Sequence, residues 1–347
     1  MVNITTNNQL KVKVLSKVRE KEWLRYFPGG TSKWSNCQFV FSQDARQYDW
    51  LVVYDDLPPQ DKERFSLNEE YLSCPIHNTL LVTTEPLIIK VYGNAYTSQF
   101  GHVLTSQEEW TLPHPKRIFS QPALHWYYGV SSKGFLAWDE MHADRPTKDK
   151  SIATVCATKQ HKIARHRQRE FITSELKAAI PGIDIYGRGV RHMDDKADAI
   201  RDYFYHVAIE NFIGKHHWTE KLPDSFLGLT LPFYDGCPNM AHYFPEESFI
   251  PIDIFKPDEA IELIKKTIHD NEYTLRFDSI IEARRRVLEE YNFFAVVSAL
   301  IEERHQPGKA ANIPLLSRRA VTRASPVNAI NQLVAKLRIR LIHRFNT

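Results

Sequence analysis

Residues 151 to 269 constrain the fold of this 347-residue chain more than any other segment, because short apolar runs and helical patterns alternate there. Each run has the length and residue types of a strand, and each stretch between runs has helical spacing. Strands alternating with helices predict a doubly wound α/β sheet. The expected strands are SIATVCAT, GIDIYGRG, YHVAIENF, LTLPFYDG and FIPIDIF, and the expected helices are ARHRQREFITSELKAAI, DDKADAIRDYF, TEKLPDSFLGL and PDEAIELIKKTI.

The first 150 residues show a weaker form of the same alternation. Four apolar runs, each bounded by polar or proline-rich residues, predict a small parallel sheet: LKVKVLS, CQFVFS, DWLVVYDDLPP and NTLLVTTEP. Between residues 105 and 150 the pattern gives way to tryptophan, proline, histidine and charge, which indicates loops before a boundary. Because the chain is longer than one core usually supports, we predict domains at 1–150 and 151–310 and a tail at 311–347.

Composition excludes several classes of protein. Hydrophobic residues at 43% and charged residues at 25% are ordinary values for a globular chain. No window approaches 18 apolar residues, and the N-terminus lacks the layout of a secretory signal, so we expect a cytoplasmic protein. Four scattered cysteines without metal-ligand spacing predict reduced thiols. His216 and His217 have no third ligand at a suitable spacing, so neither a metal nor a cofactor is expected.

The C-terminal tail is basic and amphipathic. From Arg304 onward the chain has nine of its 45 Lys and Arg residues and no Asp or Glu. Over residues 329–347 apolar side chains recur at helical spacing, with basic ones largely between them. One interpretation is a terminal helix packed on the body with a solvated basic face, and the other is peripheral contact with an anionic membrane. Nucleic-acid binding is not expected, because no motif supports it.

Polar residues stand where three of the expected strands end: Gly187-Arg188, Glu210-Asn211 and Asp235-Gly236. In a doubly wound sheet, ligands bind at the carboxyl ends of the strands. We therefore expect these residues to converge on one crevice.

Several motifs of this region resemble the donor-binding part of glycosyltransferase family 10, the α1,3/1,4-fucosyltransferases. The resemblance covers residues 150 to 270 well and the N-terminal half loosely. In chain order the matching residues are Arg169 ahead of Leu176, Tyr186-Gly187-Arg188, Lys196, Glu210-Asn211, Thr219-Glu220-Lys221, Gly236-Cys237-Pro238 and Ser248-Phe249-Ile250. In the N-terminal half, Thr83-Thr84-Glu85 looks like the acidic segment of the family. His217 stands where the family often has tyrosine.

The resemblance implies an architecture and a reaction. The architecture is two facing Rossmann-like domains, the GT-B arrangement, with the acceptor bound by residues 1–150 and the GDP-sugar by residues 151–310. The reaction is transfer of L-fucose from GDP-fucose to a glycan or a lipid-linked glycan, with inversion at the anomeric carbon. The alternatives are an enzyme of this fold that uses another nucleotide sugar and a glycan-binding protein without catalysis.

The chemistry of sugar transfer assigns roles to candidate residues. A carboxylate facing the acceptor hydroxyl acts as general base, and Glu85 is the candidate for this role. Fixed cations offset the charge of the leaving GDP, and Arg169 and Lys221 are the candidates. Each also has an ordinary structural interpretation, such as a solvated helix face for Arg169. The full set expected at the donor is Arg169, Tyr186, Gly187, Arg188, Lys196, Glu210, Asn211, His217, Thr219, Glu220 and Lys221.

Overall fold

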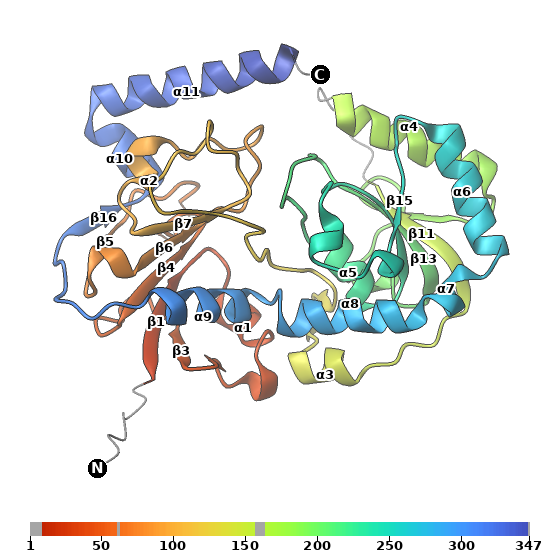
Figure 1. Ribbon diagram of the computed structural model, residues 1–347, viewed down its shortest axis with the longest axis horizontal. Coiled ribbons are helices and arrows are strands. Elements are labelled where there is room, and N and C mark those ends of the chain that lie inside the picture. The colour runs from red at the N-terminus through yellow and green to blue at the C-terminus, as the bar shows by residue number, and fades with distance from the viewer. Residues whose placement is uncertain (1–8, 61–62, 157–163, 346–347) are drawn as a thin grey trace. The chain divides into compact units, whose positions relative to one another are not determined.

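The computed structural model describes residues 9–60, 63–156 and 164–345. The chain divides into two compact units, the first made of Met1–Pro122 and Phe293–Thr347 and the second of Ala123–Asn292 (Figure 1). Each unit has its own largely parallel sheet with helices around it. The prediction of an α/β fold with two sheets is confirmed.

The sheet of the first unit has the strand order β2-β3-β1-β4-β6-β7-β8. All neighbours pair in parallel except β2 and β3 at one edge. The four predicted strands are present, and β7 and β8 were missed because their runs are short and contain polar residues. The bounds are β1 (Leu10–Leu15), β2 (Lys33–Trp34), β3 (Cys37–Val40), β4 (Trp50–Tyr54), β6 (Thr79–Val82), β7 (His102–Thr105) and β8 (Arg117–Phe119).

Chain segments from both ends of the sequence complete the first unit. A two-stranded antiparallel sheet joins β5 (Glu69–Tyr71) to β16 (Pro314–Leu316). In α9 the ring of Phe293 stacks on Trp23 with centroids 4.9 Å apart. The helices of this unit are α1 (Glu20–Leu24), α2 (Asn94–Thr97), α9 (Phe293–Arg304), α10 (Arg318–Ala324) and α11 (Pro326–Phe345), with short 3-10 turns at Pro28–Gly30 and Ile76–Asn78. The last two helices form the predicted helical tail.

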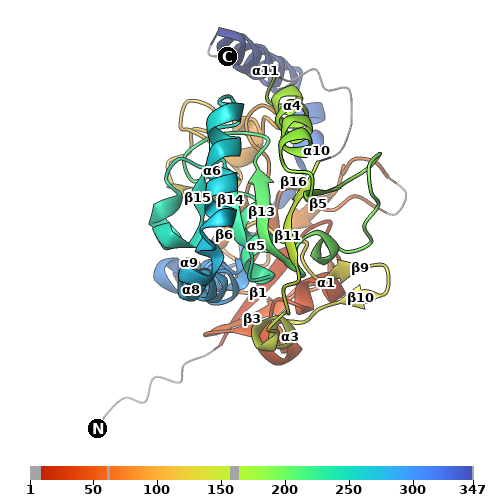
Figure 2. The same cartoon turned by 90° about the vertical axis from the view of Figure 1, so that its right-hand side faces the viewer.

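The second unit has five parallel strands in the order β12-β11-β13-β14-β15. Counted along the chain this is 2-1-3-4-5, the flavodoxin-like order of doubly wound sheets. All five predicted strands are present, as β11 (Lys150–Val155), β12 (Asp184–Tyr186), β13 (Tyr203–Ile209), β14 (Leu231–Asp235) and β15 (Ile250–Pro251). Figure 2 shows α6 in front of this sheet, with α4 beside it.

Helices of the second unit follow local sequence signals. In α6, Pro257 occupies the first turn with Asp258 and Glu259, and His269 ends the helix, which suits the helix dipole. The predicted helix over DDKADAIRDYF is instead a 3-10 turn at Lys196–Ala199, because Asp195 caps it and the chain enters β13 at Tyr203. The others are α3 (Trp138–Ala143), α4 (Ala164–Ala179), α5 (Lys221–Leu227), α6 (Pro257–His269), α7 (Glu272–Leu275) and α8 (Phe277–Glu289), with a hairpin of β9 (Val130–Ser131) and β10 (Gly134–Phe135) and 3-10 turns at Met240–His242 and Glu246–Ser248.

The unit boundaries differ from the expected ones near residues 150 and 310. Residues 123–149 belong to the second unit, where the backbone N–H groups of Tyr127 and Tyr128 both donate to the Asp224 carboxylate at 2.9 Å. Residues 293–310 belong to the first unit through the aromatic contacts of α9. Both boundaries are set by side-chain contacts between segments that are distant in the sequence. The pattern of apolar runs along the sequence does not reveal such contacts.

All four cysteines are buried free thiols, as predicted. In the described part of the chain, no group of three or more His, Cys, Asp or Glu side chains is arranged to hold a metal ion. Among the same residues, no helix has the length and apolar character needed to cross a membrane.

Candidate active site

A cavity of about 360 Å³ lies at the carboxyl edge of the second sheet. Its borders include Val155, which ends β11, and residues 207–209 of β13. In the strand order 2-1-3-4-5, the chain leaves the first and third strands toward opposite sides, and this switch point is where such sheets bind ligands. Because β11 and β13 are the first and third strands, we call this space the switch-point cavity.

Four of the predicted donor residues line the switch-point cavity, and they come from separate parts of the sequence. Arg169 comes from α4, Lys196 from the 3-10 turn before β13, and Glu220 and Lys221 from the start of α5. The volume is within the usual range for small-molecule sites. The structure thus places four residues that the resemblance assigns to the donor around one cavity. The strand-end residues that the sequence predicted to converge, Gly187-Arg188, Glu210-Asn211 and Asp235-Gly236, do not line this cavity.

Glu210 holds the start of α5 in place from below the cavity. It is fully buried directly after β13, and one carboxylate oxygen accepts the backbone N–H of Thr219 at 2.7 Å. The other oxygen accepts the Thr219 hydroxyl at 2.7 Å and lies 3.2 Å from Lys221 Nζ. A buried carboxylate is costly unless it is paired and hydrogen-bonded, and here both conditions are met. Glu210 therefore pairs with a cation and orients the Thr-Glu-Lys segment.

Lys221 and Glu220 form a charged pair on the cavity wall, with Lys221 Nζ 3.1 Å from Glu220 Oε1. Burial alone would lower the pKa of Lys221, but Glu210 and Glu220 raise that pKa above its usual value. Burial alone would raise the pKa of Glu220, but Lys221 and Lys196 hold it well below its usual range. Both groups therefore stay ionised at neutral pH.

Lys196 is held by a carboxylate that the sequence interpretation did not select. Its Nζ lies 2.6 Å from Asp224 Oδ2 and 3.7 Å from Glu220 Oε1. Asp224 is fully buried in α5, and burial raises the pKa of its carboxyl although Lys196 opposes this. Asp224 could have been found in the sequence from its position in TEKLPD, one helical turn after Glu220.

Arg169 has more spare binding capacity than the two lysines. One of its terminal nitrogens donates to the Asn211 amide oxygen, and the other donates to the Val155 carbonyl at 3.3 Å. Its Nε is buried and has no hydrogen-bond partner among the described residues. A guanidinium beside a cavity that has only neutral hydrogen-bond partners is suited to bind an anionic oxygen.

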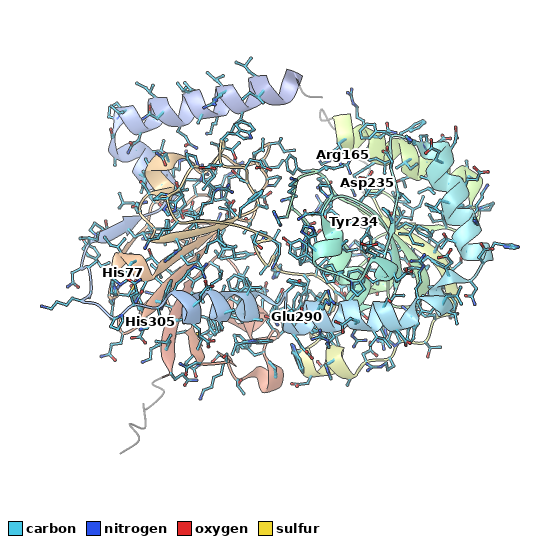
Figure 3. All side chains as sticks on the ribbon, in the orientation of Figure 1. His77, Arg165, Tyr234, Asp235, Glu290 and His305 are labelled. Carbon is cyan, nitrogen blue, oxygen red and sulfur yellow. The ribbon has the colours of Figure 1, made fainter. Side chains whose placement is uncertain are left out.

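A second arginine of α4 ties the strand ends together. Arg165 Nε donates to the Glu210 carbonyl at 2.9 Å, and its terminal nitrogen lies 2.5 Å from Asp235 Oδ1 (Figure 3). The other oxygen of Asp235 accepts the N–H of Ile254 at 2.9 Å. The sequence interpretation placed Asp235 at the crevice but missed Arg165, whose signal was lost in the basic run ARHRQR.

Gly236, in the turn after β14, has a steric reason to be glycine. A Cβ at this position would lie 2.3 Å from the Tyr234 phenol oxygen and 2.6 Å from Glu210 Cγ. That phenol accepts the N–H of Cys237 at 3.0 Å, so it cannot easily move away. The Gly-Cys-Pro turn thus packs directly against the residue that orients Thr219.

The remaining predicted donor residues do not line the switch-point cavity. Tyr186 is buried, and its phenol lies 3.0 Å from that of Tyr203. Gly187 adopts a φ of 137°, which favours glycine, and Arg188 is exposed. His217 is buried with its ring 5.2 Å from that of Phe212, and burial lowers its pKa. Tyr127 does line the cavity, although the sequence interpretation did not assign it to the donor site.

Glu85 lies in the first unit, three residues after the end of β6 at Val82, and it is exposed. Its loop is fixed through the backbone, because the Glu85 carbonyl accepts Gln107 Nε2 at 2.8 Å and the Tyr92 phenol accepts the N–H of Thr84 at 2.9 Å.

A partly buried carboxylate that was not predicted is hydrogen-bonded to this loop. Asp55, in the loop after β4, accepts bonds from Tyr92 at 2.7 Å, Lys90 at 2.6 Å and the Thr84 hydroxyl at 3.0 Å. Burial alone would raise the pKa of Asp55, but Lys90 holds it below its usual value. Asp55 thus fixes the Tyr92 phenol, which accepts the backbone N–H of Thr84. Its signal is the acidic pair that ends DWLVVYDD.

The chain is similar to known proteins in sequence and in structure. Residues 145–279 match the family model described as glycosyltransferase family 10 (fucosyltransferase), C-terminal. The chain is 34% identical over 84 residues to the alpha-(1,3)-fucosyltransferase FucT of Helicobacter pylori, which is 24% of this chain and 18% of that protein. It is 27% identical over 133 residues to a putative fucosyltransferase-like protein of Arabidopsis thaliana, which is 37% of this chain and 26% of that one.

A solved structure, described as an alpha1,3-fucosyltransferase with GDP, superimposes with a TM-score of 0.47 at 15% identity. The superposition covers 84% of this chain and 94% of the other. The doubly wound fold of the second unit is established by its strand order.

The matched segment contains the switch-point cavity residues Arg169, Lys196, Glu220 and Lys221. The resemblance that the Glu-Asn, Thr-Glu-Lys and Gly-x-Pro motifs indicate is thus confirmed: over residues 145–279 the chain matches the C-terminal part of glycosyltransferase family 10, a family of fucosyltransferases.

Proposed function

We propose that the protein transfers L-fucose from GDP-fucose to a hydroxyl group of a glycan or lipid-linked glycan, as an inverting α1,3-type fucosyltransferase. The observation that carries the proposal is the switch-point cavity, where Arg169, Lys196 and Lys221 meet at the carboxyl ends of β11 and β13. We further propose that the reaction takes place in the cytoplasm at the inner surface of the membrane.

The proposed reaction needs only the two substrates and residues of this chain. The Glu85 carboxylate takes the proton of the acceptor hydroxyl, and the acceptor oxygen attacks the anomeric carbon of the sugar from the face opposite the diphosphate. The bond from that carbon to the diphosphate oxygen breaks, and the electron pair leaves with GDP. Arg169 and Lys221 offset the developing charge without having to reorganise, because their hydrogen bonds already fix them.

Arg169 is the cation through which we propose that an anionic ligand binds, although Asp194 and Glu220 also line the cavity. Lys196 and Lys221 are paired with Asp224, Glu210 and Glu220, whereas Arg169 pairs with the neutral Asn211 amide. Glu220 retains 22% side-chain exposure, so it is accessible to ligand hydroxyls. We assign the diphosphate to Arg169 and Lys221, the ribose or fucose hydroxyls to Glu220, and the base or ribose to Asn211.

The donor assignment is tested by thermal stabilisation and transfer with a panel of nucleotide sugars. We expect GDP and GDP-fucose to raise the melting temperature and GDP-fucose alone to support transfer to an acceptor glycan. Equal stabilisation by UDP-sugars, or transfer from GDP-mannose in place of GDP-fucose, would reassign the donor within the same fold. Stabilisation by glycans with no response to any nucleotide would indicate a glycan-binding protein instead.

The role of Glu85 is tested separately by Glu85→Gln, which keeps the shape of the side chain and removes the base. We expect transfer to be lost while the affinity for GDP stays the same, because Glu85 belongs to a different unit from the switch-point cavity. Full transfer activity in this variant would remove Glu85 from the reaction.

A further inference from the structure

The terminal helix α11 has its apolar face in solvent, the reverse of an ordinary surface helix. Five residues spaced three and four apart form one stripe along the helix. Each is between 48% and 62% exposed: Val327, Ile330, Val334, Leu337 and Leu341, with Leu333 at 57% beside them. A surface helix of a globular protein normally turns such a stripe toward the core. The structure therefore contradicts the simpler interpretation, in which the apolar stripe packs on the body and basic residues face solvent.

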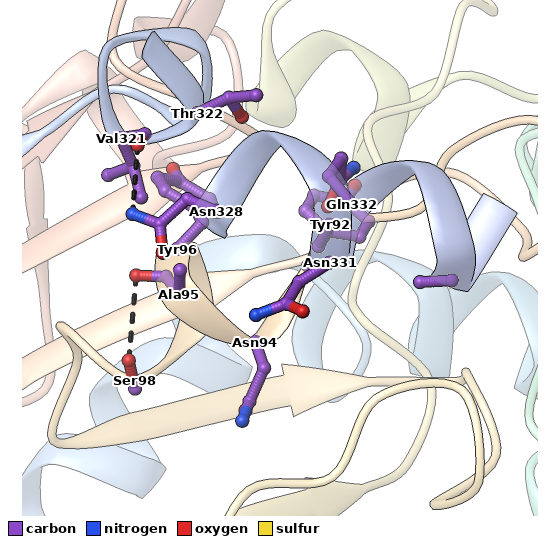
Figure 4. A pocket seen from close by; sticks show the side chains of 12 residues that line it. Tyr92, Asn94, Ala95, Tyr96, Ser98, Val321, Thr322, Asn328, Asn331 and Gln332 are labelled. Atoms are coloured by element: carbon purple, nitrogen blue, oxygen red, sulfur yellow. Dashed lines mark hydrogen bonds between the residues drawn. The ribbon is translucent and has the colours of Figure 1, made fainter. Parts of the chain in front are cut away.

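The opposite face of α11 is the less exposed one, and it combines the polar Asn328 and Gln332 with the apolar Ala335 and Ile339. Gln332 is 7% exposed and donates to the Val91 carbonyl at 2.7 Å, and Asn328 donates to the Val321 carbonyl at 3.0 Å (Figure 4). Gly93 has a φ of 85°, and a Cβ there would lie 2.0 Å from Gln332 Oε1. Glycine at this position thus leaves room for the amide that seats the helix.

Neutral polar side chains complete this seat around a cavity of about 270 Å³ between α11 and the loop that begins α2. The polar side chains lining it are Asn94, Ser98, Thr322, Asn328, Asn331 and Gln332. The contacts that hold α11 are thus amide hydrogen bonds and the buried Ile339, and the exposed apolar stripe takes no part in them.

The charge of this region is uniformly basic. Lys336 and Arg338 are exposed on α11, and Arg323 is exposed at the end of α10. No acidic residue follows Glu303 in the sequence. A helix with an exposed apolar face and cationic flanks has the pattern of helices that lie in the plane of an anionic bilayer surface.

We infer that α11 is an in-plane membrane helix, which binds anionic lipid through the stripe Val327, Ile330, Leu333, Val334, Leu337 and Leu341 and through Lys336 and Arg338. A second copy of the chain is a poorer occupant of this face, because two such helices would bring only cationic flanks together, with no carboxylate to pair them. The inference does not depend on the proposed transferase activity, since it concerns a surface of the first unit alone.

The test is co-sedimentation of the full chain with phosphatidylcholine vesicles that contain phosphatidylserine, and with phosphatidylcholine vesicles alone. We expect binding to the anionic vesicles and a loss of about tenfold or more in the double variant Leu333→Glu/Leu337→Glu. The matched control is Leu275→Glu, which makes the same change at a leucine 79% exposed on α7, and we expect it to bind like the original protein. In Lys336→Gln/Arg338→Gln, the preference for anionic vesicles should fall by about fivefold or more.

Circular dichroism of each variant verifies that the fold is intact, and gel filtration gives its oligomeric state. Failure of the original protein to sediment with anionic vesicles would overturn the inference, as would equal sedimentation of Leu333→Glu/Leu337→Glu. A dimer that dissociates in this double variant and shows no affinity for vesicles would assign the stripe to a second copy of the chain.

Discussion

Arg169 and Lys221 differ in how much of their charge the protein already uses. Lys221 contacts two carboxylates, so its charge is balanced before any ligand arrives. Arg169 contacts two neutral oxygens, so no carboxylate hydrogen-bonded to it balances its charge among the described residues. At the scale of single residues, Arg169 is therefore the stronger candidate for binding an anion, and Lys221 supports the local structure as well.

Replacing Arg169 by alanine should weaken GDP binding by about 10- to 100-fold, because a hydrogen bond to a charged group contributes roughly 1.5 to 3 kcal/mol. Isothermal titration with GDP measures this affinity. Arg167→Ala removes an exposed arginine of the same helix and serves as the control. Equal affinities for Arg169→Ala and Arg167→Ala would exclude Arg169 from the donor site.

Replacing Lys221 by methionine should destabilise the protein as well as weaken GDP binding, because Glu210 would remain fully buried without its cation. The expected loss in the free energy of unfolding is about 3 kcal/mol. Urea denaturation measures it, and the double variant Glu210→Gln/Lys221→Met should recover part of the loss. An unchanged unfolding midpoint in Lys221→Met would show that this ion pair is not needed for stability.

His206, in β13, should make stability depend on pH. Burial, with a smaller contribution from Lys196, lowers the pKa of His206 to about 3. The unfolded chain binds a proton at this residue near pH 6.5, whereas the folded protein does not until about pH 3, so stability is full above pH 6.5 and falls as the solution becomes more acidic. Between pH 6.5 and pH 5 the loss should be about 2 kcal/mol.

The measurement is the urea midpoint at pH 8 and at pH 5, for the original protein and for His206→Gln. We expect a smaller drop between the two pH values in the variant, because glutamine does not titrate. The same drop in both proteins would assign the acid sensitivity to other groups.

At the scale of secondary-structure elements, what the sequence predicted depended on how regular each segment is. Strands such as β4 and β6, and the helix α4, have the length and periodicity that local pattern recognises, and they appear where expected. The sequence predicted a ligand site at the strand ends, but the charged residues that line the switch-point cavity come from α4, the 3-10 turn before β13 and the start of α5. Asp55, Arg165 and Asp224 were not foreseen, because only the packing of distant segments gives them their partners.

The turn after β14 provides a test at this scale. Gly236→Ala would place a Cβ against the Tyr234 phenol and Glu210, so we expect a loss of about 2 kcal/mol in the free energy of unfolding and weaker GDP binding. Gly182→Ala is the matched control, because a Cβ there has no heavy atom within 4 Å among the neighbours described. If both variants unfold at the same urea concentration, the turn is not as tightly packed as the structure indicates.

At the scale of the whole molecule, each unit carries one part of the proposed reaction. The second unit has the cavity with Arg169 and Lys221, and the first unit has Glu85 and the exposed stripe of α11. Neither the unit boundaries nor the outward apolar face follows from the sequence pattern, because both depend on which segments pack together. The proposed reaction requires a sugar bound at the switch-point cavity to come within reach of Glu85.

The most direct test of this account is a crystal structure of the protein with GDP bound. We predict that the diphosphate lies in the switch-point cavity, with its oxygens within hydrogen-bond distance of Arg169 and Lys221 and with Glu220 near the ribose. GDP bound elsewhere on the chain, or a diphosphate that contacts neither Arg169 nor Lys221, would contradict the account.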